Sequence, residues 1–418
     1  MGIYLIRPKN TGKLKAFNSM GTGLDAESRI HQLNMVRNHN ANLLAQKEIS
    51  DFVKSKDLKA YTDPDNPGAT GVTIVDLPDE EAQESLATLS TDDFIYARNE
   101  EIHLIQPVVE KQSLKGEEDL EDRDLWHIRR IGLDKLRANG CDLCGRDINI
   151  AVLDTGIDST HPALRDKVLT SFKFGRYGNE VQEESLDFHG HGTHVAGLIC
   201  GEKVGVAVGA KLHSCVIFPQ AGQGTMMELI RALDWVAENP QISIVNMSAG
   251  IPGFITAEIM HQAISALTEV GVLTVCAVGN DGRDASCSPG NYSEVMSVGA
   301  IDSQNKVCRF SGGGTVLPNY SNPLRSKVNP HIYVIPKVSA PGADIYSCVP
   351  QGGYESWSGT SMAAPIVSGI AAMILEKYGP MELLELKEEL YERCISIEGI
   401  GETRQGYGVV LVDKLLNI

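Results

Sequence analysis

The sequence predicts an α/β fold, a parallel sheet flanked by helices, which is preceded by a small α+β domain. Four short apolar runs have the near-continuous hydrophobic character of strands buried on both faces of a sheet, at residues 148–153, 212–218, 242–247 and 272–278. Helical stretches lie between these runs, notably at residues 226–237 and 257–270. Strands that alternate with helices are typical of a parallel sheet covered by helices.

A length of 418 residues suits two domains, one of them large. We predict that residues 1–106 form the smaller domain, with strands at 3–6, 71–77 and 94–105 and helices at 24–53 and from Pro78 onward. Residues 107–125 are rich in charge and predict a solvated acidic linker. Residues 126–418 then form the larger α/β domain.

Charge and hydropathy exclude several classes of function. The formal net charge of −17 argues against nucleic acid and against an anionic membrane surface as the main partner. No apolar run approaches the roughly 20 residues that a membrane-spanning helix needs, and the first residues lack the long apolar stretch of a secretory signal. The nine cysteines, all beyond residue 140, fit a reducing compartment. We therefore expect a cytoplasmic protein without a membrane partner.

Two short motifs in the sheet domain contain residue types that can carry out catalysis, one around Asp154 and one around His191. Asp154 ends a buried strand and opens the stretch Asp-Thr-Gly, at the edge where open α/β sheets place their sites. An isolated Asp-Thr-Gly is more often a simple turn. Residues 189–197 read His-Gly-His-Gly-Thr-His-Val-Ala-Gly. These histidines suggest zinc, but no carboxylate follows at the helical spacing of metalloproteases, and the glycines beside His191 leave its imidazole accessible.

A third motif surrounds Ser361, in the stretch Ser-Gly-Thr-Ser-Met-Ala-Ala-Pro at residues 358–365. An apolar helix follows it, so Ser361 could be only a helix cap. The same position also offers free N–H groups and the positive end of the helix dipole, which stabilise negative charge.

Taken together, in the order Asp, His, Ser, the three motifs resemble the subtilisin (subtilase) family over roughly residues 126–415. The resemblance implies a serine endopeptidase in which Ser361 is the nucleophile, His191 the general base and acid, and Asp154 the group that orients the imidazole. Asn280, in Gly-Asn-Asp-Gly after a buried strand, matches the residue that donates to the oxyanion. His194 matches a structural histidine of the family, and His189 matches no catalytic position.

The same resemblance implies how a protein or peptide substrate is held. Ser248, Ala249 and Gly250 would pair with the substrate backbone as an added strand, with Gly222 and Gly224 on its other side. Apolar side chains of Met226, Leu229 and Ala249 would shape a pocket for the fourth residue before the cut. Cys287 would form the floor of the primary specificity pocket and Asp281 its rim, where an acid would favour Lys or Arg.

Residues 1–106 resemble the inhibitory propeptide that precedes many subtilases and assists their folding. Its tail, near residues 103–106, would lie in the cleft like a product, so the chain's own propeptide would be an intramolecular inhibitor. Pro107 is a poor residue just after a cut, which puts the expected processing site later in the linker. An unrelated binding domain is the alternative.

Other segments depart from the family pattern. After Gly197 the chain is too short for the loop that forms the strong calcium site of many relatives, so calcium is unsupported and no metal or other cofactor is predicted. Residues 312–337 form an insertion on the surface. Cys141 and Cys144 have the spacing of a metal or redox pair, but without a second pair two ordinary thiols are the better interpretation.

Two other functions compete with hydrolysis. A peptide ligase or macrocyclase would use the same triad behind a cover that excludes water, and the 312–337 insertion is the candidate cover. A catalytically inactive binding or chaperone protein is the third hypothesis. The intact set of triad and oxyanion residues argues against it.

Overall fold

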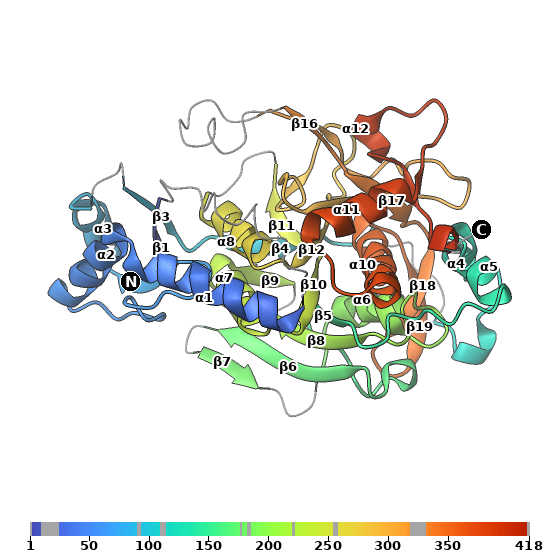
Figure 1. Cartoon of the computed structure of the whole chain (residues 1–418), viewed down its shortest axis with the longest axis horizontal. Coiled ribbons are helices and arrows are strands. Elements are labelled where there is room, and N and C mark those ends of the chain that lie inside the picture. The colour runs from blue at the N-terminus through green and yellow to red at the C-terminus, as the bar shows by residue number, and fades with distance from the viewer. Residues whose placement is uncertain are drawn as a thin grey trace.

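The computed structural model describes residues 2–9, 25–89, 93–108, 114–175, 178–181, 185–219, 222–253, 258–317 and 332–415. Within these residues the sequence folds into a small domain and a large one (Figure 1).

The small domain contains a three-stranded antiparallel sheet with helices packed against it. Its strands lie in the order β2 (Thr73–Leu77), β1 (Gly2–Pro8), β3 (Phe94–Arg98). The helices are α1 (Ala26–Asn42), α2 (Leu44–Ser55) and α3 (Asp79–Leu86), the last of which begins after Pro78 as predicted. The single helix expected at residues 24–53 is wrong. At Leu43 the backbone is extended, with ψ of 131°, which ends α1 and lets α2 turn back toward the sheet.

The predicted strand at residues 94–105 is also two strands. β3 ends at Arg98, and β4 (Glu101–Leu104) pairs in another sheet, within the large domain. Asn99 occupies the break between them. Its side chain accepts a hydrogen bond from Met227 N at 2.9 Å and donates one to Thr225 Oγ1 at 2.9 Å. These contacts hold the chain where it passes from one domain to the other.

The large domain is built on a ten-stranded sheet, and this confirms the predicted α/β class. The strand order is β20-β21-β17-β14-β12-β10-β5-β8-β6-β7, and all neighbouring pairs are parallel except those that join β20 and β7 to the sheet. The strands are β5 (Asn149–Asp154), β6 (Val168–Gly175), β7 (Gly178–Val181), β8 (Lys211–Val216), β10 (Ile242–Met247), β12 (Leu273–Ala277), β14 (Met296–Ile301), β17 (Val338–Pro341), β20 (Cys394–Ile395) and β21 (Val409–Val410).

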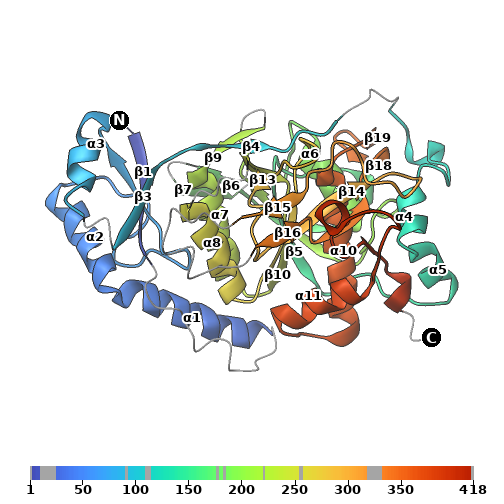
Figure 2. The same ribbon diagram turned by 90° about the horizontal axis from the view of Figure 1, so that it is seen from above.

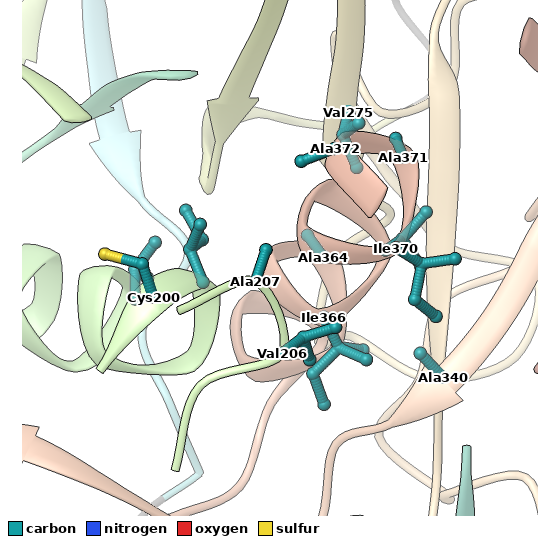
Figure 3. Packing of buried hydrophobic residues seen from close by; sticks show 14 of the residues in the cluster. Cys200, Val206, Ala207, Val275, Ala340, Ala364, Ile366, Ile370, Ala371 and Ala372 are labelled. Atoms are coloured by element: carbon teal, nitrogen blue, oxygen red, sulfur yellow. The ribbon is translucent and has the colours of Figure 1, made fainter. Parts of the chain in front are cut away.

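Helices cover both faces of this sheet. On one face α6 (His191–Cys200) and α10 (Thr360–Tyr378) pack in the core that contains Ile150 and Val152 (Figure 3). On the other face α7 (Met226–Glu238) and α8 (Glu258–Glu269) pack with Ala151 and Leu153. Alternate residues of β5 therefore enter opposite cores, which explains its unbroken apolar sequence.

Shorter elements complete the structure. They are α4 (Trp126–Arg130), α5 (Leu133–Ala138), α11 (Leu383–Glu392) and α12 (Glu402–Gln405), the 3-10 turns Glu117–Asp119, Pro162–Leu164 and Asp413–Leu415, and strands β9 (Gln223–Thr225), β11 (Ala249–Pro252), β13 (Cys287–Ser288), β15 (Gly314–Val316), β16 (Tyr333–Ile335), β18 (Ile345–Val349) and β19 (Gly353–Trp357). β15 and β16 pair as the base of the predicted insertion, of which residues 318–331 lie outside the described part of the chain.

The linker predicted as solvated is partly buried. Leu120 and Asp124 are 7% and 8% exposed, and Lys115 forms a bridge with Tyr354 of β19. Most of the described linker residues are exposed, as predicted, but charge density alone does not reveal the paired charge at Asp124. Asp124 accepts from Lys115 at 2.6 Å and from Glu121 N at 2.8 Å, so it can be buried.

Candidate active site

Asp154 and His191 face each other at the carboxyl edge of the sheet. Asp154 is the last residue of β5 and His191 the first residue of α6, and their side chains are 1% and 0% exposed. His191 Nδ1 lies 2.8 Å and 2.9 Å from the two carboxylate oxygens. A carboxylate in this position holds the imidazole with its other nitrogen, Nε2, available for chemistry. Among the described residues Nε2 has no hydrogen-bond partner.

Ser361 is the second residue of α10 and is fully buried. Its hydroxyl donates a hydrogen bond of 3.0 Å to the carbonyl of Ile105, from the chain segment that follows β4. The hydroxyl is therefore directed at a backbone carbonyl of the small domain's tail, while His191 Nε2 is left without a partner.

Asn280 follows β12 and has its side-chain amide fixed by Thr360. Asn280 Oδ1 accepts from Thr360 N and from Thr360 Oγ1, both at 2.9 Å. This pairing turns Nδ2 the other way, where it donates to the carbonyl of Gln106 at 2.8 Å. A preorganised amide of this kind is suited to stabilising a carbonyl oxygen that gains negative charge.

β4 lies between two strands of the large domain as the third strand of a small antiparallel sheet, β13-β11-β4-β9 (Figure 2). Ala249 and Gly250 of β11 pair with Leu104 and His103, and Gly224 of β9 pairs with Ile102. These are the sequence-predicted backbone contacts on both sides of an added strand.

Two further backbone hydrogen bonds continue this pairing toward Ser361. Leu104 N donates to Gly222 O at 3.1 Å and Ile105 N donates to Ser248 O at 3.0 Å. Side chains at Gly224 and Gly250 would be impossible in this arrangement, because a Cβ there would lie 2.1 Å from Ile217 O and 2.4 Å from Ser288 O. Gly224 thus lets β9 approach the backbone that follows β8, and Gly250 lets β11 approach β13.

Ser361 and Asn280 bind two consecutive backbone carbonyls of the tail that follows β4, one carbonyl each. Ile105 O accepts from Ser361 Oγ, whereas Gln106 O accepts from Asn280 Nδ2. Attack by a hydroxyl requires that one and the same carbonyl present its carbon to the nucleophile and its oxygen to the oxyanion donor. In the structure Ser361 Oγ and Asn280 Nδ2 bond to different carbonyls, and the chain then continues through Pro107 to Val108, whose N–H donates to Ser358 O at 2.7 Å.

Side-chain pockets surround the same strand. Ile102 and Leu104 are 0% and 4% exposed and belong to one hydrophobic cluster with Met226, Leu229 and Ala249. Cys287 is buried, with Sγ 3.8 Å from an oxygen of exposed Asp281. Burial, together with the neighbouring carboxylate, raises the pKa of Cys287 to about 12, so the thiol is neutral. The structure thus brings together the predicted floor and rim residues.

The imidazole rings of the other two histidines of the motif do not hydrogen-bond to Asp154, His191 or Ser361. His194 stacks on Trp357 with ring centroids 4.6 Å apart and bonds through Nε2 to Glu355 O. Burial lowers the pKa of His194 to about 3 and keeps it neutral. His189 is exposed. Within the described residues, no group of His, Cys, Asp and Glu side chains is arranged to hold a metal ion.

Sequence analysis missed Asp187, a buried carboxylate that connects the two loops of the site. It accepts five hydrogen bonds, from Thr155 Oγ1 (2.9 Å), His189 N (3.0 Å), Gly190 N (2.9 Å), Thr193 N (2.9 Å) and Thr193 Oγ1 (2.8 Å). Thr155 adjoins Asp154, and the other donors flank His191. Its position just before α6 could have indicated this role, because an acid that precedes a helix can accept hydrogen bonds from the free N–H groups of the first turn.

We expect Asp187→Asn to lower kcat by about tenfold to a hundredfold while KM changes less than threefold. An amide offers one acceptor where five donors converge, so the relative position of Asp154 and His191 should loosen, and a small displacement can have an effect of this size. Steady-state kinetics with a peptide substrate measures the two constants. Asp166→Asn, at an exposed turn, is the control. A loss of thermal stability with unchanged kcat would show that Asp187 serves folding alone.

The two domains also meet away from the cleft, at the end of α7. Asp234 accepts from Thr70 N at 2.8 Å and Thr70 Oγ1 at 2.9 Å. Arg29 of α1 is buried and donates through Nη1 to Pro240 O and Ile242 O, while Arg37 forms an ion pair with Glu238. Helix α1 therefore attaches the small domain to the large one at a second place.

Comparison with known proteins agrees with this geometry. The model of the subtilase family matches residues 145–408. The chain is 32% identical to Subtilisin DY of Bacillus licheniformis over 274 residues, which are 63% of this chain and 89% of that protein. It is 34% identical to an intracellular serine protease of Paenibacillus polymyxa over 262 residues, 60% of this chain and 74% of that protein. In the described part of the chain no helix is long and apolar enough to cross a membrane.

Proposed function

Because this chain belongs to the subtilase family and is a serine-type endopeptidase, we propose that Asp154, His191 and Ser361 are its catalytic triad, with Asn280 as an oxyanion donor. The single observation that carries this assignment is the convergence of four segments. His191 Nδ1 lies 2.8 Å from Asp154, and Ser361 and Asn280 contact the two consecutive carbonyls of one strand in the cleft.

The proposed reaction proceeds through an acyl-enzyme. Ser361 Oγ attacks the scissile carbonyl carbon while its proton passes to His191 Nε2, and Asn280 Nδ2 donates to the oxygen that becomes negative. The C–N bond breaks as His191 gives the proton to the leaving amine nitrogen. A water molecule, deprotonated by the same imidazole, then attacks the ester, and the acid product leaves as Ser361 regains its proton.

Reaction with a fluorophosphonate probe tests the assignment. After the chain has matured, we expect the probe to be attached to Ser361, which peptide mass spectrometry would identify. His191→Ala should abolish the labelling because the base is missing, whereas His189→Ala should retain it. Equal labelling of the wild type and His191→Ala would refute the triad.

The domain boundaries belong to the same proposal, with residues 1–106 as an inhibitory propeptide, 107–125 as the linker with the processing site and 126–418 as the catalytic domain. Inhibition is supported by β4, which occupies the cleft between β9 and β11. It is also supported by the tail that follows β4, where Ile105 O accepts from the Ser361 hydroxyl and Gln106 O accepts from Asn280 Nδ2. An inhibitor held in this way occupies the place where a substrate strand would bind. Cleavage in the linker would then release the cleft.

Hydrolysis and ligation differ in the mass of the product, since hydrolysis adds one water. Nothing in the described residues favours ligation, and the base of the 312–337 insertion packs against Val278. We infer that protein and peptide substrates are hydrolysed, in an intracellular setting like that of the Paenibacillus polymyxa relative. All nine cysteines are free thiols, which agrees with a reducing compartment.

Burial of Asp234 where the two domains meet makes the attachment of the propeptide depend on pH, although the hydrogen bonds from Thr70 act in the opposite direction. Burial raises the pKa of Asp234 to about 7 in the joined domains. Once exposed, an aspartate has a pKa of about 3.9. Between these values the separated form has lost its proton while the joined form retains it. The attachment is therefore strongest at low pH, weakens as pH rises from about 4 to 7, and changes little above that.

We expect Asp234→Asn to remove this dependence and to strengthen the attachment above pH 7. Urea titrations from pH 5 to 8 in a Ser361→Ala background, followed by the fluorescence of adjacent Trp235, measure the midpoint. The advantage of Asp234→Asn should grow from pH 5 to 7 and then level off. Asp142→Asn, whose side chain is 89% exposed, should parallel the parent. Parallel pH curves for Asp234→Asn and the parent would disprove this role.

A further inference from the structure

A basic hollow lies beside the cleft, between the linker, α4 and the start of β18. It has a volume of about 870 Å³ and is lined by four cationic side chains, Lys115, Arg123, Arg129 and Arg130. Two acids, Asp124 and Asp344, line it as well. A concentration of cations is notable in a chain whose net charge is −17, because most of the surface repels acidic segments.

The acids in the hollow leave two of its guanidinium groups without an acidic partner. Asp124 is already paired with Lys115 at 2.6 Å, and Arg123 is paired with Glu121 at 2.8 Å. The Arg129 side chain is exposed and forms no ion pair or hydrogen bond with the described residues, and the Arg130 side chain donates to the neutral Asn305. These two side chains can bind carboxylates without first breaking an ion pair.

Two hydrogen bonds link the hollow to the part of the cleft that would receive the C-terminal side of the cut. Val108, just past the divided carbonyls, donates to Ser358 O at 2.7 Å. Ser358 Oγ in turn accepts from Asp344 N at 2.8 Å, and Asp344 lines the hollow. A substrate that leaves the site along the path of Val108 therefore approaches Arg129 and Arg130 within a few residues, since an extended chain advances about 3.3 Å per residue.

We propose that the basic hollow binds acidic side chains of protein substrates on the C-terminal side of the scissile bond, beyond the position that Val108 occupies. This inference rests on the proposed function, and it makes the enzyme favour bonds that are followed by an acidic stretch. Guanidinium groups bind carboxylates through paired hydrogen bonds, and Trp126 and Tyr346 provide apolar surface beside them. Because the site is open, the effect should be moderate and should weaken as salt is added.

Peptides that differ only downstream of the cut test the proposal. One series carries Glu-Glu, Gln-Gln or Lys-Lys at the fourth and fifth residues after the scissile bond, and a short reference peptide ends at the third residue. With the self-processed enzyme at low salt we expect KM to be about threefold to tenfold lower for Glu than for Gln, and higher for Lys, with similar kcat. In Arg129→Gln/Arg130→Gln this order should disappear, whereas Arg165→Gln, at an exposed position outside the hollow, should keep it.

The short peptide separates failure of this inference from failure of the proposed function. The proposal is supported if wild type and double variant cleave the short peptide equally and only the double variant loses the preference for Glu. Equal KM values for Glu, Gln and Lys peptides in the wild type would overturn the hollow as a substrate site. So would a Glu preference that survives in the double variant. No cleavage of the short peptide by wild type would count against the proposed function.

Discussion

Replacing Ser361 by alanine is expected to lower kcat for peptide hydrolysis by about six orders of magnitude, the size of the loss for the equivalent change in subtilisin itself. The substitution removes one oxygen, whose hydrogen-bond partner is the Ile105 carbonyl, so the fold should be kept. The proposed self-processing would stop with hydrolysis. Intact-mass spectrometry should then find the chain uncleaved over days, while the wild type matures.

Ser368→Ala is the matched control for this experiment. Ser368 is a buried serine on the same helix, with its hydroxyl bonded to Asn246 Oδ1 at 3.0 Å, and it has no role in the proposed chemistry. It should mature and hydrolyse peptides at close to the wild-type rate. His191→Ala combined with Ser361→Ala should be no slower than Ser361→Ala alone, because the two residues act as a unit. Maturation of purified Ser361→Ala by itself would rule out self-processing.

Much of the large domain could be predicted from the sequence because its signals are local. The four buried strands appear within one or two residues of the predicted runs, since a strand covered on both faces must be apolar throughout. Asp154, His191 and Ser361 each occupy the end of a strand or the start of a helix, as their flanking sequences indicated. Short motifs thus predicted where these residues lie on the strands and helices, and the fold places His191 Nδ1 2.8 Å from Asp154.

Features that depend on long-range contacts could not be predicted in the same way. The division of residues 94–105 into β3 and β4 depends on contacts of Asn99 with Thr225 and Met227, which no local pattern reveals. Asp187 likewise is an unremarkable acid until five donors converge on it. The division of the Ile105 and Gln106 carbonyls required the three-dimensional positions of Ser361 and Asn280, although the sequence did predict that this tail lies in the cleft.

Asn280→Ala is expected to lower kcat by about a hundredfold to a thousandfold and to change KM little. Loss of one such donor costs about 3–4 kcal/mol of transition-state stabilisation in subtilisin itself. The amide is directed by Thr360, so its Nδ2 is in place before any charge develops and loses no freedom during the reaction. Initial rates over a range of peptide concentrations separate the two constants.

Asn280→Asp distinguishes loss of the donor from loss of the support around it. A carboxylate can still accept from Thr360 N and Thr360 Oγ1, but it has no N–H to offer and would place a negative charge beside the developing oxyanion. We therefore expect it to be at least as slow as Asn280→Ala, whereas Thr360→Val, which keeps the Asn280 donor but loses one of its anchors, should be slowed far less. A fall in affinity with kcat preserved in Asn280→Ala would mean that this side chain binds the ground state, as it binds Gln106 O in the unprocessed chain, and contributes nothing more in the transition state.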